Sequence, residues 1–296
     1  MAVELSTRTR SGQPTTPTFT TMRFPAGEAH VKVAAGPDES ADTPATQTPA
    51  THTPATDLVE VVTLRGTSGD DLVMLGMWAD AVRQRGSRSV ALVPYLPGAR
   101  QDRGLPFGAK VYADILNGFH IDQVIAFDPH SPVIVDLIAD LTVVASARIV
   151  RDEVVGAPGT EQAYQGIIAP DAGAVARATA AADACGLPVY RAEKHRNPDT
   201  GKLDGFTCEP LPDTGRFLVV DDICDGGGTF MGLAGSTGLP KERLGLWVSH
   251  GVFSGRAAQL ADHFGEIVTT DSYPAQNAIE GLRTVPLTPY LTEEIR

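Results

Sequence analysis

Residues 217–230, FLVVDDICDGGGTF, place three carboxylates and a glycine-rich turn after a run of apolar residues. Asp221 and Asp222 are adjacent at the end of a predicted buried strand, and Asp225 follows three residues after Asp222. Adjacent like charges repel each other, so they need a compensating partner such as sugar hydroxyls or a bound Mg²⁺. The N–H groups of the turn can converge on an anion, and a helix starting at Thr229 would add a favourable dipole. A diol beside a phosphate describes a ribose 5-phosphate, which these residues therefore predict as a ligand.

Apolar runs alternate with amphipathic stretches beyond residue 57, and this alternation predicts an α/β fold with mainly parallel sheets. The predicted strands are residues 58–66, 89–96, 123–130, 141–147, 166–171, 188–194, 217–223, 243–250 and 266–272, and the predicted helices include residues 70–86 and 172–186. Ligands of such sheets bind beyond the carboxyl ends of the strands. The polar residues at these predicted ends are Asp128, His130, Asp171, Lys194, Asp221 and Asp222.

Composition narrows the classes of function. The chain has 296 residues and a formal net charge of -12, which argues against nucleic-acid binding and against binding to an anionic membrane. No apolar run approaches the ~18 residues of a membrane span, and the N-terminal segment lacks the apolar core of a secretory signal. The three cysteines, Cys185, Cys208 and Cys224, indicate reduced thiols in a cytoplasmic protein rather than disulfides or a zinc site.

Residues 42–57, DTPATQTPATHTPATD, differ from the rest of the chain. They repeat T-P-A-T without apolar periodicity, and proline recurs too often for a helix or a paired strand. We therefore expect a disordered, solvated insertion at about residues 36–57.

Further segments resemble, in the same order, those of the ribose-phosphate pyrophosphokinases, the enzymes that make phosphoribosyl pyrophosphate (PRPP). The segment DDICDGGGT itself resembles the PRPP-binding signature of the phosphoribosyltransferase fold, which enzymes that make PRPP share with enzymes that consume it. The other similar segments are RFPAGE (23–28), VPYLPGARQDRG (93–104), FDPHSP (127–132), APDAGAVARA (169–178), AEKHR (192–196) and VSHGVFSGRA (248–257).

This resemblance implies a fold and a reaction. The fold is α/β, with two tandem phosphoribosyltransferase-like domains over residues 1–140 and 141–296, the second carrying the PRPP-binding loop. In the reaction, the anomeric hydroxyl of ribose 5-phosphate attacks the β-phosphorus of Mg²⁺-bound ATP and releases AMP. Such a transfer depends chiefly on positioning and charge neutralisation. The resemblance also implies Mg²⁺ as cofactor and a homo-oligomer.

The resemblance assigns roles to individual residues. The ATP-binding residues would be Arg100, Gln101, Asp102, Phe24 and Glu28, with Phe24 and Glu28 in a loop that reaches the adenine site of a neighbouring subunit. The catalytic residues would be Lys194, Arg196 and His130, and the metal-binding residues His130 and Asp171. The ribose-phosphate residues would be Asp221, Asp222, Asp225, Gly226, Gly227, Gly228 and Thr229. The polar segment HRNPDTGKLDG, which contains Arg196, is predicted to be a loop.

The sequence also departs from the family. Only about twenty residues precede the loop at Phe24, where family members have a full strand–helix unit. Ala26 replaces a polar residue, and a shortened GLP follows Arg103. Gly226 and Gly227 replace residues that include a threonine, so the phosphate loop loses a hydroxyl and gains backbone freedom. These changes suit a roomier sugar-phosphate pocket. The sequence also resembles short members of the family from phages and bacteria, some of which are similar to enzymes that diphosphorylate ADP-ribose, and this resemblance implies ADP-ribose as the alternative acceptor.

Two rival functions remain from other classes. A phosphoribosyltransferase that consumes PRPP has no need of the ARQDR and FDPH segments, whose presence counts against it. A regulatory homologue without activity is disfavoured because Lys194, Arg196 and His130 are all retained. We assign no role to His195, and we expect His250 to be structural.

Overall fold

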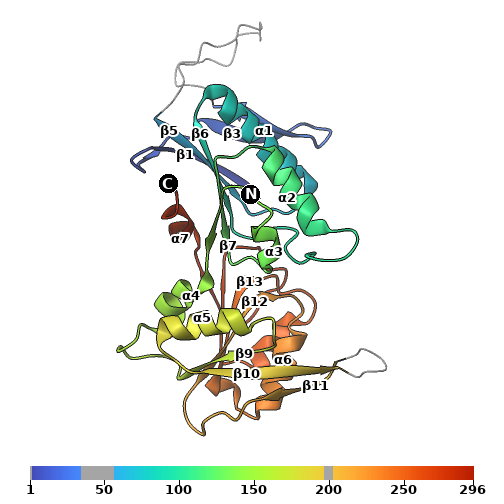
Figure 1. Ribbon diagram of the computed structural model, residues 1–296, viewed down its shortest axis with the longest axis vertical. Helices are drawn as coiled ribbons and strands as arrows, with labels where there is room; N and C mark the ends of the chain where they lie inside the picture. Colours follow the sequence, from blue (N-terminus) through green and yellow to red (C-terminus); the bar gives the residue numbers. More distant parts are fainter. Residues whose placement is uncertain (1, 35–56, 197–202) are drawn as a thin grey trace, which may run out of the picture. The chain divides into compact units, whose positions relative to one another are not determined.

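The structure is a computed structural model that describes residues 2–34, 57–196 and 203–296, with the backbone alone described at residues 196, 203 and 204. It divides into two compact units (Figure 1). Unit 1 is formed by Met1–Val143 and Tyr290–Arg296, and unit 2 by Val144–Pro289. The sequence placed a division between residues 140 and 141 and did not anticipate that the C-terminal segment joins unit 1.

Unit 1 contains a six-stranded sheet in the order β2-β1-β5-β6-β7-β8. Strands β5, β6 and β7 are parallel, whereas β1 is antiparallel to both β2 and β5. A separate antiparallel hairpin is formed by β3 and β4. The bounds are β1 Val3–Thr9, β2 Pro14–Thr15, β3 Phe19–Arg23, β4 Ala29–Val33, β5 Leu58–Leu64, β6 Arg88–Val93, β7 Gln123–Phe127 and β8 Leu141–Val144. The first four strands were not predicted, because their short polar segments lack a continuous apolar run.

Helix α1 (Gly69–Arg85) shows how local sequence fixes the ends of an element in unit 1. Its first turn is a capping box, in which Ser68 Oγ accepts from Asp71 N at 3.2 Å and the Asp71 carboxylate accepts from Ser68 N at 3.1 Å. It ends at Gly86, whose φ of 72° is the left-handed conformation typical of such ends. Leu75, Trp78 and Val82 lie on one side of the helix and are fully buried in the core of unit 1. The other helices are α2 Gly108–Gly118 and α3 Pro132–Val135, and α7 Thr288–Thr292 precedes the C-terminus.

Unit 2 contains a seven-stranded sheet in the order β11-β10-β9-β12-β13-β14-β15. All neighbouring strands are parallel except β11, which pairs antiparallel with β10. The bounds are β9 Gly166–Ala169, β10 Val189–Arg196, β11 Leu203–Cys208, β12 Phe217–Cys224, β13 Leu244–Gly251, β14 Glu266–Thr270 and β15 Leu282–Val285. Every residue of β13 is buried, as expected for a central strand covered on both faces.

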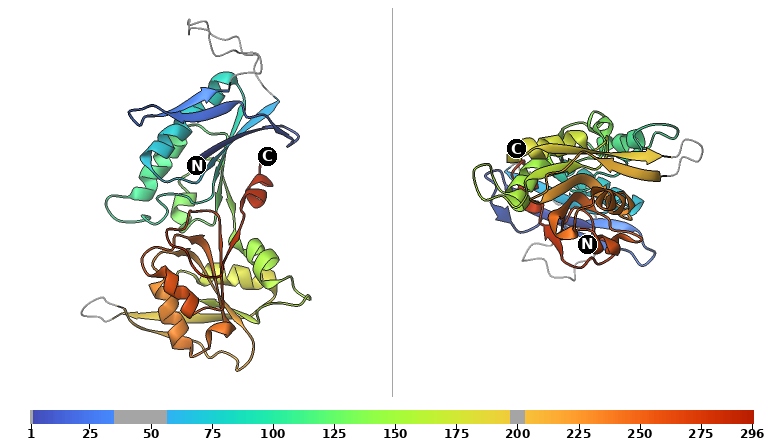
Figure 2. Two further views of the ribbon diagram at one scale, coloured as in Figure 1. Left: turned by 180° about the vertical axis from the view of Figure 1, so that it is seen from behind. Right: turned by 90° about the horizontal axis from the view of Figure 1, so that it is seen from below.

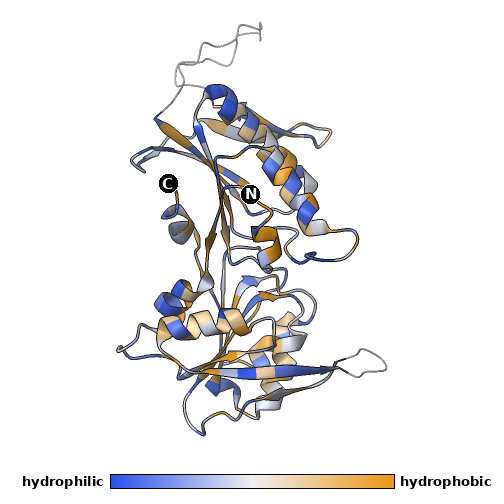
Figure 3. Cartoon of the chain, in the orientation of Figure 1, coloured by the Kyte–Doolittle hydropathy of each residue, from blue (hydrophilic) through white to orange (hydrophobic). Residues whose placement is uncertain are grey.

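Helices cover both faces of this second sheet. Phe230 and Leu233 of α6 (Gly228–Thr237) pack in one core with Phe217 and Val219 of β12. Figures 1 and 2 show α5 (Val175–Cys185) on the opposite face. The shorter helices are α4 Ser146–Ile149, the π-helix η1 Val150–Val155, and the 3₁₀ helices η2 Lys241–Arg243 and η3 Ala257–Asp262. Figure 3 shows hydrophobic residues concentrated on the inner strands, whereas the outer part of β10 is mainly hydrophilic.

The α/β fold with mainly parallel sheets is confirmed, and each of the nine predicted strands overlaps an observed strand. The predicted loop HRNPDTGKLDG is wrong at both ends, where His195 and Arg196 continue β10 and Leu203 begins β11. Its polar composition is typical of a loop, but antiparallel pairing at the edge of the sheet satisfies the backbone there. Residues 197–202, and residues 36–56 of the predicted disordered insertion, lie outside the described residues.

Candidate active site

The paired carboxylates stand where β12 extends beyond its neighbour. The last residue pair between β12 and β9 is Val219 with Ile168, so Asp221 and Asp222 lie past the end of the β9 ladder. Asp221 Oδ1 accepts a hydrogen bond from Asp222 N at 2.9 Å, and Asp222 Oδ1 accepts from Ile223 N at 2.7 Å. These bonds to the rigid strand fix both side chains, which are only 14% and 7% exposed.

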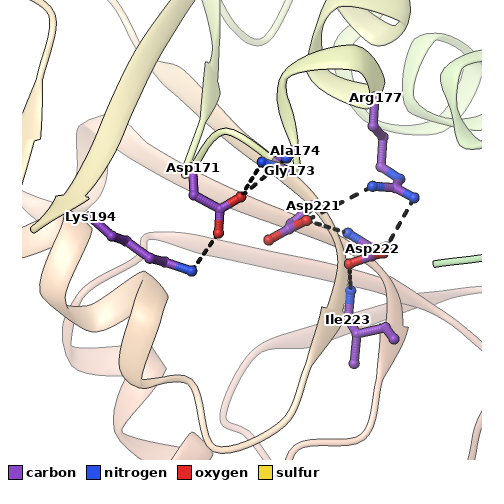
Figure 4. A network of polar contacts seen from close by, with 8 residues as sticks. All are labelled: Asp171, Gly173, Ala174, Arg177, Lys194, Asp221, Asp222 and Ile223. Carbon is purple, nitrogen blue, oxygen red and sulfur yellow. Dashed lines mark hydrogen bonds and ion pairs between the residues drawn. The ribbon is translucent and has the colours of Figure 1, made fainter. Parts of the chain in front are cut away.

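Arg177 of α5 is the cation that partly neutralises this pair (Figure 4). Its Nη2 lies 3.3 Å from Asp222 Oδ2, and its Nη1 lies 4.0 Å from Asp221 Oδ1. From the sequence we expected a ligand to be the compensating partner, and this residue was not predicted. A signal was available, because Arg177 is the single arginine in a predicted helix made mostly of alanine.

One arginine does not fully compensate two buried carboxylates. Burial, together with the charge of Asp222 and to a smaller extent that of Asp171, raises the pKa of Asp221 to about 7. The hydrogen bond from Asp222 N and the nearby Arg177 lower the pKa only in part. The site therefore favours hydrogen-bond donors or further positive charge beside Asp221.

Asp171 follows β9 and contacts Lys194 of the neighbouring β10 (Figure 4). Its Oδ1 accepts hydrogen bonds from Gly173 N at 2.9 Å and Ala174 N at 3.1 Å, which fixes the carboxylate at the start of the turn. Its Oδ2 accepts from the Lys194 ammonium. The last pair of β10 with β9 joins Arg191 to Ala169, so Lys194 lies on the part of β10 that extends past the end of β9.

The glycine-rich turn leads directly into α6, which begins at Gly228, one residue before the expected Thr229. Gly227 is the residue before the helix and has a φ of 75°, a conformation that a side chain disfavours. The turn is anchored by Phe253 N donating to Cys224 O and Ser254 N donating to Asp225 O, both at 2.9 Å. The first N–H groups of a helix have no partner within that helix, so this end presents donors suited to an anion.

Cys224 lies between the carboxylates and the turn but is not suited to act as a nucleophile. Its thiol is buried, and burial, together with the charges of Asp225 and Asp221, raises its pKa to about 12. A thiol with so high a pKa is protonated at neutral pH. Packing in the core of unit 2 therefore accounts for this residue.

The predicted ATP-binding residues lie in unit 1. Phe24 and Glu28 close the hairpin between β3 and β4, with Phe24 N donating to Glu28 O at 2.9 Å. The Phe24 side chain is 43% exposed, and its ring lies 5.2 Å from that of His30. Both residues of this hairpin tip are therefore exposed to solvent.

Arg100, Gln101 and Asp102 lie between β6 and α2, and His130 lies after β7. Gln101 O accepts from Ala109 N at 2.9 Å, which ties this segment to the first turn of α2. Arg100, Gln101 and His130 are exposed, and Asp102 is half-buried. A φ of 38° at the buried Asp128 turns the chain two residues before His130.

The structure thus brings Asp171, Lys194, Asp221 and Asp222 together in unit 2 and adds Arg177 to them (Figure 4). The side chain of Arg196 lies outside the described side chains. His195 pairs instead with Thr207, its Nε2 lying 2.9 Å from Thr207 Oγ1.

Other side chains that could carry chemistry serve as structural contacts. His250 is buried, and its Nδ1 lies 2.8 Å from Ser272 Oγ. This contact supports the structural role expected for His250.

The donor chemistry of unit 2 fits a magnesium ion bound together with its substrate. Among the described residues, no three histidine, cysteine or acidic side chains converge to form a complete metal site. Mg²⁺ typically binds through one or two carboxylates, with substrate phosphates and water completing its shell. Asp171 offers a fixed, partly exposed carboxylate of this kind.

Within the described part of the chain, no helix has the length and apolar character needed to span a membrane.

Comparison with known proteins places this fold and site in a class. No protein-family model matches the chain. Ribose-phosphate pyrophosphokinases of Maricaulis maris and Pasteurella multocida are each 30% identical to it, covering 80% and 77% of this chain and 80% and 76% of their own. That of Hyphomonas neptunium is 29% identical over 80% of each chain. The crystal structure of phosphoribosylpyrophosphate synthetase from Mycobacterium smegmatis has a TM-score of 0.71 at 21% identity, covering 93% of this chain and 88% of that chain.

The structural match confirms the predicted fold class, with its two phosphoribosyltransferase-like parts. Fold, site and relatives together define an α/β enzyme of the diphosphotransferase class. The chain belongs to the ribose-phosphate pyrophosphokinase family.

Proposed function

We propose that the protein transfers the diphosphoryl group of ATP to the anomeric hydroxyl of ribose 5-phosphate, giving PRPP and AMP. The observation that carries this proposal is the arrangement of Asp221 and Asp222 directly before the N-terminus of α6. The two carboxylates can accept hydrogen bonds from the sugar hydroxyls, and the N–H groups at the start of the helix can donate to the phosphate. A ribose 5-phosphate requires both kinds of group. The relatives named ribose-phosphate pyrophosphokinase support the same substrate.

Asp221 and Asp222 would accept hydrogen bonds from the ribose diol. Their residual negative charge favours donors, because Arg177 alone neutralises only part of it. Asp225, Gly226, Gly227, Gly228 and Thr229 would surround the 5-phosphate, whose charge suits the N-terminus of α6. Binding the sugar at both ends fixes the anomeric oxygen for attack, which is the main requirement of such a transfer.

On the ATP side, Arg100, Gln101 and Asp102 would contact the nucleotide, and His130 would reach its phosphates. The exposure of Arg100, Gln101 and His130 supports this role, because a ligand can reach exposed side chains from solvent. The exposed hairpin tip with Phe24 and Glu28 supports contact with adenine in a second copy of the chain, and hence a homo-oligomer.

The transfer also needs cations, because charge spreads over the moving group. Lys194 and Arg196 would supply two of them, the latter on the basis of sequence alone. Asp171 would hold Mg²⁺, and the resemblance alone assigns His130 as a further metal ligand; the ion would neutralise phosphate charge when bound. The free thiols of Cys185, Cys208 and Cys224 support a reducing, cytoplasmic environment.

ADP-ribose is a second candidate acceptor, and a feature of the phosphate loop favours it. A Cβ atom at Gly228 would meet no heavy atom within 4 Å, and one at Gly226 would meet only Ser254 O, at 3.9 Å. This open space beside the loop could accept a substituent on the 5-phosphate. Ribose 5-phosphate remains the first candidate, because the relatives are named for it.

The test incubates the full-length protein with ATP, MgCl₂ and either acceptor, and separates the products by anion exchange. We expect AMP and a diphosphorylated product with ribose 5-phosphate. Asp222→Asn should raise the KM for the acceptor about ten- to a hundredfold, because one charge-assisted bond is worth roughly 1.5–3 kcal/mol.

Asp213→Asn, at an exposed carboxylate of the same unit, is the matched control and should leave the KM unchanged. The proposal would be overturned if the protein formed no AMP with either acceptor but released pyrophosphate from PRPP in the presence of a nitrogenous base.

A further inference from the structure

Both oxygens of the proposed metal ligand Asp171 are already engaged in the structure. Oδ1 accepts from two backbone N–H groups, of Gly173 and Ala174, at 2.9 and 3.1 Å. Oδ2 accepts from the Lys194 ammonium, and the two side chains are 25% and 23% exposed. Backbone N–H groups hold Oδ1, and they cannot move without movement of the main chain. Only the Lys194 side chain holds Oδ2, so Oδ2 is the oxygen that a ligand can reach by displacing a side chain.

We propose that Lys194 occupies the cation position on Asp171 in the free enzyme and that a divalent cation displaces it. This inference rests on the proposed function, in which Asp171 holds the metal and Lys194 acts on the transferring group. A single ammonium would thus serve twice, first as the counterion of Asp171 and then as a cation for the phosphates. Lys194 would become available only once the metal has bound.

The fold permits this exchange without movement of the main chain. The backbone of Lys194 is paired with Phe206 of β11, so the strand holds its Cα in place. Its flexible four-carbon stem lets the ammonium move by rotation of the side chain alone. The partial exposure of both side chains gives a metal ion access from solvent.

The negative charge of the carboxylate cluster favours a cation on Asp171 at every stage. Asp171 adds to the negative field that raises the pKa of Asp221, so an Asp171 carboxylate without a counterion would increase the negative charge of the cluster. The ammonium of Lys194 suppresses this charge while the metal is absent. Removing the ammonium should leave Asp171 Oδ2 without a competing cation and so strengthen metal binding, although the metal ligands stay the same.

The experiment measures Mn²⁺ binding to the substrate-free, full-length protein by electron paramagnetic resonance. Lys194→Met keeps most of the side-chain length but removes the charge, and should tighten Mn²⁺ binding about three- to tenfold. Lys194→Arg keeps the charge and should stay within about twofold of the parent. Asp171→Asn should weaken binding, and the double variant with Lys194→Met should recover none of the gain.

The matched control is Arg191→Met, which removes one exposed cation from the same strand without touching Asp171. An equal gain in this control would show a general change of field and would overturn the proposal, as would unchanged binding in Lys194→Met. If Lys194→Met is not folded, Lys194→Gln takes its place with the same expectation. Because no substrate is present, this result is independent of whether the protein forms AMP, so failure of the metal exchange and failure of the proposed reaction are separate outcomes.

Discussion

Asp221→Asn should stabilise the protein at neutral pH while impairing its use of the acceptor. Asn keeps the shape of the side chain and the oxygen that accepts from Asp222 N, but it removes a buried charge. The carboxylate has a pKa of about 7 in the folded protein against 3.8 as its ordinary value. A carboxyl group with a raised folded pKa destabilises the fold wherever it must ionise, so the penalty grows as the pH rises from about 4 to about 7.

The size of this effect follows from the same pKa values. At 1.36 kcal/mol per pKa unit the full penalty is at most about 4 kcal/mol at pH 8, and it falls to about 1 kcal/mol at pH 4.5. Thermal unfolding should therefore show a rise in Tm of several degrees at pH 8. The rise at pH 4.5 should be a small fraction of this.

Asp213→Asn is again the control and should show no change in Tm at either pH, because its carboxylate is exposed. A Tm for Asp221→Asn equal to or below that of the parent at pH 8 would refute the reasoning. It would mean that Arg177 already compensates the Asp221 charge in full.

Four further predictions address the rest of the site. Arg177→Met should destabilise the protein by about 3 kcal/mol in urea unfolding, because it removes the cation beside two buried carboxylates; unchanged stability would exclude a neutralising role. Gly227→Ala should lower both stability and acceptor binding through its left-handed φ and a Cβ 3.0 Å from a leucine side chain, whereas Gly238→Ala, with a similar φ of 66° and open space, should lower stability alone. Lys194→Ala should reduce kcat at least a hundredfold with little change in ATP binding measured by calorimetry, and loss of ATP affinity at normal kcat would contradict this. Deleting residues 42–57 should leave Tm and turnover nearly unchanged, and a large loss of either would show that this segment is structural.

The sequence was most informative where apolar runs mark buried strands. Residues 217–223 predicted β12 and the carboxylates at its end, because a continuous apolar run followed by charges has few other structural solutions. For the polar residues His195 and Arg196 the sequence predicted a loop, which is wrong. Pairing with β11 stabilises a strand there that composition alone does not indicate. Local composition therefore predicts central strands better than edge strands.

Within the site, the sequence predicted the acidic residues but not their counterion. Asp221 and Asp222 are neighbours in the chain, whereas Arg177 lies on a helix 44 positions earlier and reaches them only through the packing of α5 against β12. The contact between Asp171 and Lys194 likewise depends on how far β10 extends past the end of β9. Such contacts depend on how the strands pair and how the helices pack in the folded protein. The spacing of residues along the sequence does not determine either.

The central claim is that the bond broken in ATP joins its α- and β-phosphates. Phosphorus nuclear magnetic resonance of the full-length protein with ATP, MgCl₂ and ribose 5-phosphate measures this directly. We predict one equivalent of AMP for each new diphosphate attached to the anomeric carbon, and no orthophosphate. Formation of ADP with a monophosphorylated sugar would contradict the account, because it would show transfer of the γ-phosphoryl group alone.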